Sequence, residues 1–166
     1  MKLNLGSGLD YKPGFINLDS DKNLKADIYH NINKFPWPFP DNTFSEIHCF
    51  HILEHVDNLI ETMQEIKRIS KKGAIIKIKV PLFPSIHSVS DPTHKRYFTY
   101  ITFNYFTDKS FYNIPRFNIK TRKIKFSWSN KTKWLDKLIN LAPVFYSRFL
   151  SSILPSNELY IELLNS

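Results

Sequence analysis

At 166 residues, with 42% hydrophobic and 23% charged residues, the sequence has the length and composition of one globular domain, which we assign to residues 1–166. These values exclude a disordered chain, and the single cysteine, Cys49, excludes an internal disulfide framework. The net charge is +8, no apolar run is long enough to cross a bilayer, and no signal peptide is visible, so we expect a cytoplasmic protein.

Short apolar runs in the first fifty residues predict a series of strands. The runs are Lys2–Leu5, 15–18, 27–29 and 46–50. A glycine turn, Gly6-Ser7-Gly8, follows the first run, and only residues 9–14 separate this turn from the second run. Such a short connection leaves no room for the crossover helix that normally joins two parallel strands. The sequence therefore predicts a fold without a helix between its first two strands.

The spacing of apolar residues changes after residue 56. Apolar residues recur at spacings of three and four at Val56, Leu59, Ile60, Met63, Ile66 and Ile69. This pattern predicts an amphipathic helix that is capped by Asp57 and stopped at residues 71–73. Residues 74–80 are rich in β-branched side chains and precede Pro81, which predicts another strand. Strands that alternate with a helix favour a parallel sheet.

Four further elements are expected in the second half of the chain. They are a helix over residues 99–109, a strand over 117–128, one or two helices over 132–153 broken at Pro143, and a strand over Glu158–Leu164. Two late strands after a parallel run often pair antiparallel at one sheet edge. We therefore expect an antiparallel edge formed by the C-terminal strands.

The glycine turn and the acid at the end of the second strand point to a nucleoside ligand. Glycines allow the backbone to approach a ligand, and the carboxylate of Asp19 can accept hydrogen bonds from ribose hydroxyls. The turn lacks the third glycine and the helix of the dinucleotide fingerprint, and it lacks the lysine of a P-loop. The pattern therefore favours a nucleoside ligand without a phosphate.

Several segments, taken in order, resemble a known enzyme family. They are LNLGSG, INLD, ADIYHNI, FPWPFPDNTFSEIHCFHILEHV, GAIIKIKVP and DPTHKRYFT. This order resembles the class I S-adenosylmethionine-dependent methyltransferases, in particular the small type 11 methyltransferase-domain group, over about residues 2–107. The resemblance implies an α/β, Rossmann-like, mostly parallel sheet with helices on its faces, here reduced at its N-terminus. It also implies transfer of a methyl group from S-adenosylmethionine to a small-molecule or glycan acceptor.

The resemblance assigns cofactor-binding roles to individual residues. The backbone of Leu5, Gly6, Ser7 and Gly8 would contact the methionyl part, Asp19 the ribose, Asn31 the adenine, and Phe50 and His51 the surroundings of the sulfonium. Asn31 stands where the family usually has an aspartate, and its amide can still bond adenine. Asn4 stands at a position that is usually acidic, so we expect weaker attraction for the positive charges of the cofactor.

Polar residues cluster in the loop that follows the fifth predicted strand. They are His87, Asp91, His94, Arg96 and Tyr97. One interpretation is a general base, a histidine steered by Asp91, which would deprotonate an acceptor hydroxyl. A second is that Arg96 and Lys95 orient an anionic substrate. The third is a hydrogen-bonded loop without a chemical role. The candidate catalytic residues are His51, His87 and His94. His30 and His48 are interpreted as structural.

A zinc site is the competing interpretation of the segment after the fourth strand. His51-Ile52-Leu53-Glu54-His55 matches the H-x-x-E-H motif of inverted zincin peptidases, in which two histidines on one helix share a metal ion. The alternative is that His51 ends a strand and that Glu54 and His55 begin the next helix without a metal. Later helices offer few acidic residues for the further ligand, so we predict no metal site.

Two other functions remain open at this point. Residues 116–137 hold eight basic residues and one acid, mixed with aromatic residues, which is typical of a nucleic-acid contact or of a half-exposed edge strand. The first interpretation would make the protein an RNA-directed methyltransferase. Asn4, Asn31 and the missing helix are also compatible with a binding module that keeps the fold without catalysis. Cys49 lies in an apolar run and is interpreted as a buried packing residue.

Overall fold

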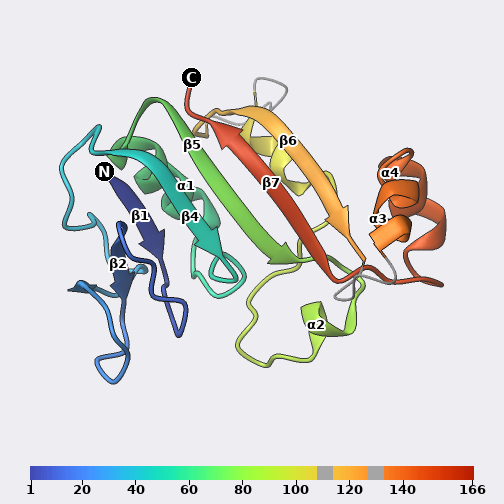
Figure 1. Cartoon of the computed structure of the whole chain (residues 1–166), viewed down its shortest axis with the longest axis horizontal. Helices are drawn as coiled ribbons and strands as arrows, with labels where there is room; N and C mark the ends of the chain where they lie inside the picture. The colour runs from blue at the N-terminus through green and yellow to red at the C-terminus, as the bar shows by residue number, and fades with distance from the viewer. Residues whose placement is uncertain (108–113, 127–132) are drawn as a thin grey trace.

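A computed structural model describes residues 1–107, 114–126 and 133–166. Seven strands form one sheet in the order β3-β2-β1-β4-β5-β7-β6 (Figure 1). Their bounds are β1 Lys2–Leu5, β2 Ile16–Asp19, β3 Ile28–Tyr29, β4 Phe44–Phe50, β5 Ser70–Pro81, β6 Asn118–Lys125 and β7 Glu158–Leu164. The pairings among β1 to β5 are parallel, and β7 pairs antiparallel with both β5 and β6. The expected Rossmann-like sheet with an antiparallel C-terminal edge is confirmed.

The main helix, α1 (Leu59–Ile69), begins and ends at different residues from those predicted. Its N-cap is Asn58, whose side chain accepts hydrogen bonds from the backbone N–H groups of Ile60 and Glu61. Asp57 precedes the cap, and its carboxylate pairs with Lys95. At its other end the helix passes directly into β5 at Ser70, so residues 71–73 are part of a strand and not a helix stop.

The remaining helices are short. They are α2 Ile86–Val89, the 3-10 helix η1 Thr102–Phe106, α3 Lys133–Ile139, α4 Pro143–Phe145 and the π-helix η3 Tyr146–Leu150. The helix predicted over 99–109 is thus a single 3-10 segment, and its residues 108 and 109 lie outside the described residues. The same holds for residues 127 and 128 of the predicted strand and for residue 132. Pro143 starts α4, so the break predicted there is confirmed.

Only one face of the sheet is covered by the main helix. In Figure 1, α1 lies behind the strands, and no helix of the described part crosses in front of them. The alternation along β5 agrees, because Ile76 and Ile78 are fully buried whereas Lys77 and Lys79 are partly exposed. Cys49 is fully buried with the first pair, as predicted. The uncovered face results from the short connection between β1 and β2, which has no helix.

The described helices also bear on membrane insertion. Within residues 1–107, 114–126 and 133–166, no helix combines the length and the apolar character that crossing a bilayer requires.

Candidate functional site

The carboxyl ends of β1, β4 and β5 meet at the lower edge of the sheet in Figure 1. Each of these strands is followed by a segment with candidate site residues: the glycine turn after β1, His51 after β4 and the polar loop after β5. Ligands of open α/β sheets bind at this edge, where strands end and loops diverge. The fold therefore brings together segments that are distant in the sequence.

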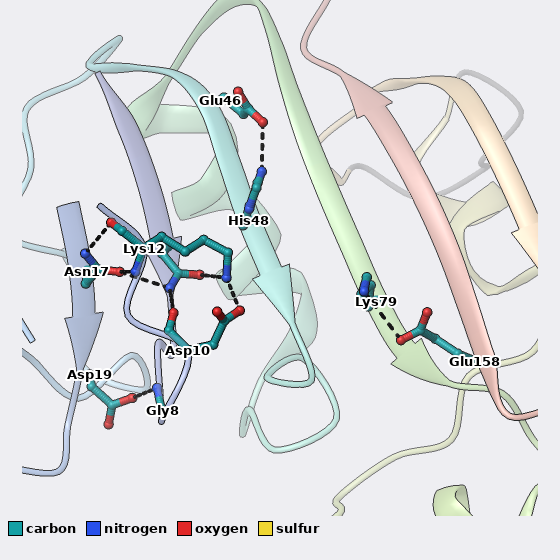
Figure 2. A network of polar contacts seen from close by, with 10 residues as sticks. Gly8, Asp10, Lys12, Asn17, Asp19, Glu46, His48, Lys79 and Glu158 are labelled. Carbon is teal, nitrogen blue, oxygen red and sulfur yellow. Dashed lines mark hydrogen bonds and ion pairs between the residues drawn. The ribbon is translucent and has the colours of Figure 1, made fainter. Parts of the chain in front are cut away.

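The glycine turn packs closely against the segment after β4. Gly6 and Gly8 have φ values of +63° and +52°, a backbone conformation that favours glycine. A Cβ atom on Gly6 would lie 2.5 Å from Cδ1 of Ile52, so no larger residue fits there without movement. The backbone N–H of Gly8 donates to Oδ2 of Asp19 at 2.7 Å, and both are seen in Figure 2. Asp19 and the turn thus form one unit at the end of β1 and β2.

Asn4 lies at the centre of a polar network beside this turn. The side chain is almost fully buried, and its Nδ2 donates to the carbonyl of Asp10 at 2.8 Å and to Oδ1 of Asn17 at 3.0 Å. Its Oδ1 accepts a hydrogen bond from Nζ of Lys12. The same ammonium pairs with the Asp10 carboxylate (Figure 2). It also lies 5.1 Å from the ring centroid of Phe50. An ammonium group of the protein therefore occupies the neighbourhood in which a cofactor cation was expected.

Asn17 holds the short connection between β1 and β2 in place. Its side chain accepts from the backbone N–H of Lys12 at 2.8 Å and donates to the carbonyls of Lys12 and Phe15 at 3.0 and 3.1 Å. These bonds satisfy backbone groups that a crossover helix would satisfy internally. This role of Asn17 was not predicted, although a polar residue inside the apolar run INLD was the available signal.

A polar cavity of about 400 Å³ opens at the same edge of the sheet. It is lined by His51, Glu54, His55, Pro81, His87, Ser90, Asp91, His94, Asn157 and Glu158. The cavity brings together all three candidate catalytic histidines. His51 follows β4, His87 lies in α2, and His94 lies in the loop after α2. It lies near the glycine turn, because Ile52, the residue after His51, packs against Gly6, but no residue of the turn lines the cavity.

His51 is held between two carboxylates. Its Nε2 lies 3.0 Å from Oε2 of Glu158, and its Nδ1 lies 3.4 Å from Oε1 of Glu54. The hydrogen bond with Glu158, followed by that with Glu54, outweighs the effect of burial and raises the pKa of His51 to about 9. The charged form of His51 is thus favoured, and both of its ring N–H groups are directed at carboxylates, which does not suit it to removing a proton.

Glu158, at the start of β7, was not expected in the site. Burial favours its neutral form, but the hydrogen bond from His51 and the charges of Lys79 and Lys125 outweigh burial and lower the pKa of Glu158. Figure 2 shows Lys79 reaching this carboxylate across the sheet. An acid at the start of a mostly apolar terminal strand was the available signal in the sequence.

The segment that matches H-x-x-E-H is a turn and not a helix. The backbone N–H of His55 donates to the carbonyl of Ile52 at 3.1 Å, and α1 begins only at Leu59. The expectation that Glu54 and His55 begin the helix was therefore wrong, and the helical arrangement of the peptidase motif is also absent from this segment. The turn instead brings Glu54 and His55 next to His94 from the loop after β5.

Arg96 and Lys95 fasten the polar loop to this turn. The guanidinium of Arg96 donates to the backbone carbonyls of Val56 and Asp57, and the ammonium of Lys95 pairs with the Asp57 carboxylate. The backbone N–H of Lys95 also donates to the carbonyl of Glu54 at 2.8 Å. These contacts favour the interpretation of the two basic residues as loop anchors, whereas Asp91 and His94 face the cavity.

The other predicted residues are placed as follows. Asn31 is exposed beyond the end of β3, and its Oδ1 accepts from the backbone N–H of Asn33. The ammonium groups of Lys79 and Lys12 both lie over the ring of Phe50, and that of Lys79 is 4.8 Å from the ring centroid. His30 contacts the carbonyl of Lys34 and His48 contacts Glu46, and neither histidine lines the cavity.

A comparison with protein families identifies the chain. Residues 7–117 match the model of the methyltransferase domain family. The chain belongs to this family. The resemblance to class I S-adenosylmethionine-dependent methyltransferases of the type 11 group is thereby confirmed. No curated protein sequence matches the chain.

Solved structures of several methyltransferases share the fold. An S-adenosylmethionine-dependent methyltransferase from Archaeoglobus fulgidus is 19% identical with a TM-score of 0.64, and the match covers 98% of this chain and 85% of that one. A protein from Bacillus halodurans, described only provisionally as a methyltransferase, is 12% identical with a TM-score of 0.69, covering 99% and 91%. The cyclase SpnF is 13% identical with a TM-score of 0.60, covering 98% and 74%. At these identities the likeness concerns the fold alone.

Proposed function

We propose that this chain binds S-adenosylmethionine at the glycine turn and transfers its methyl group to a hydroxyl of a small-molecule or glycan acceptor. The observation that carries the proposal is the histidine-lined cavity at the same edge of the sheet as the glycine turn, with His51 in its lining and the next residue, Ile52, packed against Gly6. Class I methyltransferases need the acceptor atom next to the sulfonium, so a cofactor site and an acceptor cavity must adjoin. Family membership supports the same activity.

The residues of the turn fit an adenosyl ligand. A Cβ atom on Gly8 would meet nothing within 4 Å, which leaves open space over the turn. Oγ of Ser7 is buried and has no hydrogen-bond partner among the described residues. The two carboxylate oxygens of Asp19 each accept one backbone N–H, from Gly8 and Asp21, and each keeps a lone pair for a ribose hydroxyl. Leu5, Asn31, Phe50 and His51 would complete the proposed site.

The cofactor, when bound, supplies an electrophilic methyl group. The chain supplies position and proton transfer. His51, whose two ring nitrogens face Glu158 and Glu54, would hold these carboxylates in place at the wall of the cavity. His87 and His94 are the imidazoles that could accept the hydroxyl proton, because both line the cavity. As the acceptor oxygen forms its bond to the methyl carbon, the carbon–sulfur bond breaks and S-adenosylhomocysteine leaves.

Calorimetric titration with S-adenosylhomocysteine tests the cofactor site. We expect binding to the full chain, a loss of at least about tenfold in affinity for Asp19→Ala, and no change for Asp21→Ala, the matched exposed acid two residues away. Absence of binding at millimolar ligand would overturn the proposal.

A second measurement tests the reaction. Formation of S-adenosylhomocysteine from S-adenosylmethionine is followed with hydroxylated small molecules, with glycans and with RNA. Turnover with either of the first two supports the proposal. Cofactor binding without turnover on any acceptor would instead favour the inert module. Methylation of RNA alone, with steep dependence on salt, would favour the basic tract. Within that tract, Arg122 donates to Asn104 and Lys125 pairs with Glu158, so part of its charge has intramolecular partners.

A further inference from the structure

We propose that Glu54, His55 and His94 form a binding site for a divalent transition-metal ion, for which Zn²⁺ is the probe. One ligand-capable atom from each of the three side chains lies within 4.8 Å of the other two. The three residues come from the turn after β4 and the loop after β5, and all of them line the polar cavity. This site differs from the H-x-x-E-H motif, because its second histidine is His94 and not His51.

The hydrogen bond of His94 fixes which ring nitrogen is free. Its Nδ1 lies 3.1 Å from the backbone carbonyl of Ser88, and a carbonyl oxygen can only accept. The proton of the neutral ring therefore sits on Nδ1, and Nε2 keeps a lone pair, with Oδ2 of Asp91 at 3.8 Å. A histidine that donates one N–H to a backbone carbonyl and offers its other nitrogen is the usual arrangement of a metal ligand.

His55 is held in the same tautomer by a chain of two hydrogen bonds. The hydroxyl of Thr93 donates its single proton to Oδ1 of Asp91 at 2.6 Å. Its oxygen must then accept from Nδ1 of His55, which lies 3.0 Å away. The Nε2 of His55 therefore also keeps a lone pair, and Asp91 acts through Thr93 as a positioning residue.

Glu54 supplies the observation that points most directly to a bound cation. The residue is 1% exposed, and its Oε2 has no hydrogen-bond partner within the part of the chain that the structure describes. A buried carboxylate oxygen without a donor is costly, and a cation in contact with it removes that cost. Oε1 is directed to His51 at 3.4 Å, so Oε2 is the oxygen left for an ion.

The donor set agrees with the chemistry of Zn²⁺. Two imidazole nitrogens and one carboxylate oxygen are a common catalytic zinc set and leave a further coordination position open. Ligand atoms on one tetrahedral Zn²⁺ lie roughly 3.3 Å apart, given metal–ligand distances of about 2.0 Å. Side-chain rotation would therefore have to shorten separations of up to 4.8 Å by as much as about 1.5 Å.

The ion would also divide the roles of the cavity histidines. This step rests on the proposed methyl transfer. An open coordination position directed into the cavity would bind the acceptor oxygen, so His94 would act as a metal ligand and not as the base. His87, which lines the same cavity but is not part of the cluster, would remain to accept the proton.

Zinc titration of the metal-free full chain tests the site. We expect one equivalent of Zn²⁺ to bind, with losses in affinity of at least about 100-fold for Glu54→Gln, His55→Ala and His94→Ala. Thr93→Val, which removes only the hydroxyl that orients His55, should cost about tenfold. His87→Ala, a histidine of the same cavity outside the cluster, should bind Zn²⁺ as the wild type does.

Two results would overturn the proposal. One is no stoichiometric binding by the wild-type chain, and the other is equal affinity in wild type and ligand variants. If a variant fails to fold, the side-chain ¹H–¹⁵N spectrum of the wild type decides: Zn²⁺ must shift Nε2 of His55 and His94 and leave His30 unchanged. All titrations are made without cofactor or acceptor, so a failure of zinc binding and a failure of methyl transfer are separate results.

Discussion

Gly8 donates a backbone hydrogen bond of 2.7 Å to the carboxylate of Asp19, so the glycine turn is tied to the end of β2 by a side chain. A second bond, from the backbone N–H of Ser7 to the carbonyl of Leu18 at 3.0 Å, runs beside it. Without a helix between β1 and β2, these two bonds determine the shape of the turn. Asp19 therefore has a structural task in addition to its proposed contact with ribose.

Substitutions of Asp19 should separate the two tasks. Asp19→Ala removes the acceptor for Gly8 and should lower the free energy of unfolding by about 1 kcal/mol. Asp19→Asn keeps an acceptor oxygen and should cost less than half as much, yet both variants should bind S-adenosylhomocysteine more weakly. Urea unfolding and calorimetry measure the two effects. Equal destabilisation by both variants would contradict the structural task.

The two glycines of the turn should differ in their tolerance of alanine. Both have positive φ, so either substitution should cost about 1 kcal/mol in backbone strain. Gly6→Ala should cost more, because its Cβ meets Ile52 at 2.5 Å, whereas the space beyond Gly8 is open. Gly6→Ala should therefore lower the free energy of unfolding less in the Ile52→Ala background than in the wild-type chain. Additive costs in a double-mutant cycle would contradict the contact.

Lys12 should weaken the binding of a cationic cofactor. Its ammonium bonds Asn4 and lies over the ring of Phe50, close to the proposed position of the sulfonium. Lys12→Met should therefore raise the affinity for S-adenosylmethionine about threefold to tenfold, with a smaller effect on S-adenosylhomocysteine, which lacks the sulfonium charge. Lys25→Met, which removes a lysine that lies over Tyr11, is the control. An equal effect on both ligands would place the sulfonium elsewhere.

Glu46 should make the stability of the protein sensitive to acid. Burial favours its neutral form, but hydrogen bonds from Lys77, Lys2 and His48 outweigh burial and lower its pKa to about 2. A lowered pKa contributes stability that is present above the unfolded value of about 4.5 and is lost as the pH falls toward 2. Glu46→Gln should thus cost about 2 to 3 kcal/mol at pH 7 and clearly less at pH 3.

Denaturant unfolding at the two pH values checks this expectation. Glu61→Gln, which changes an exposed acid of α1, should show no such dependence. A cost of Glu46→Gln that is the same at both pH values would contradict the ion-pair explanation.

The thiol of Cys49 should be unreactive in the folded protein. The side chain is fully buried in β4, and burial raises the pKa of the thiol. Labelling with a disulfide reagent should be at least about 100-fold slower in buffer than in denaturant. A Ser152→Cys variant, at an exposed position, supplies the fast-reacting reference thiol. Fast labelling of the wild-type chain under native conditions would show that β4 opens readily.

Local patterns predicted the strands well, and long-range contacts explain what they missed. The apolar runs of β1, β2 and β4 are signals contained in four to seven residues, and the strands lie within two residues of the predicted bounds. The cap of α1 was misplaced by one residue, and Asp57 instead pairs with Lys95, which is 38 residues away. No local pattern contains that contact.

In the candidate site, too, local features were predicted from the sequence and long-range contacts were not. The turn Gly6-Ser7-Gly8 and Asp19 could be located from sequence because they follow strands directly. The spacing of H-x-x-E-H suggested a shared helix face, but the segment turns back, and His94 from another loop lies beside Glu54 and His55. The partner of His51, Glu158, is 107 residues away, so only the pairing of β5 with β7 reveals it.

The position of β7 has a consequence for how the protein is made. Although β7 is the last strand in sequence, it lies between β5 and β6. When only residues up to 157 have left the ribosome, β5 and β6 each have the edge that β7 will occupy without a pairing strand. The sheet closes, and His51 gains Glu158 as its second carboxylate partner, only when residues 158–164 emerge. Nascent chains stalled before and after this segment should therefore differ sharply in protease resistance, since the final strand completes both the fold and the cavity.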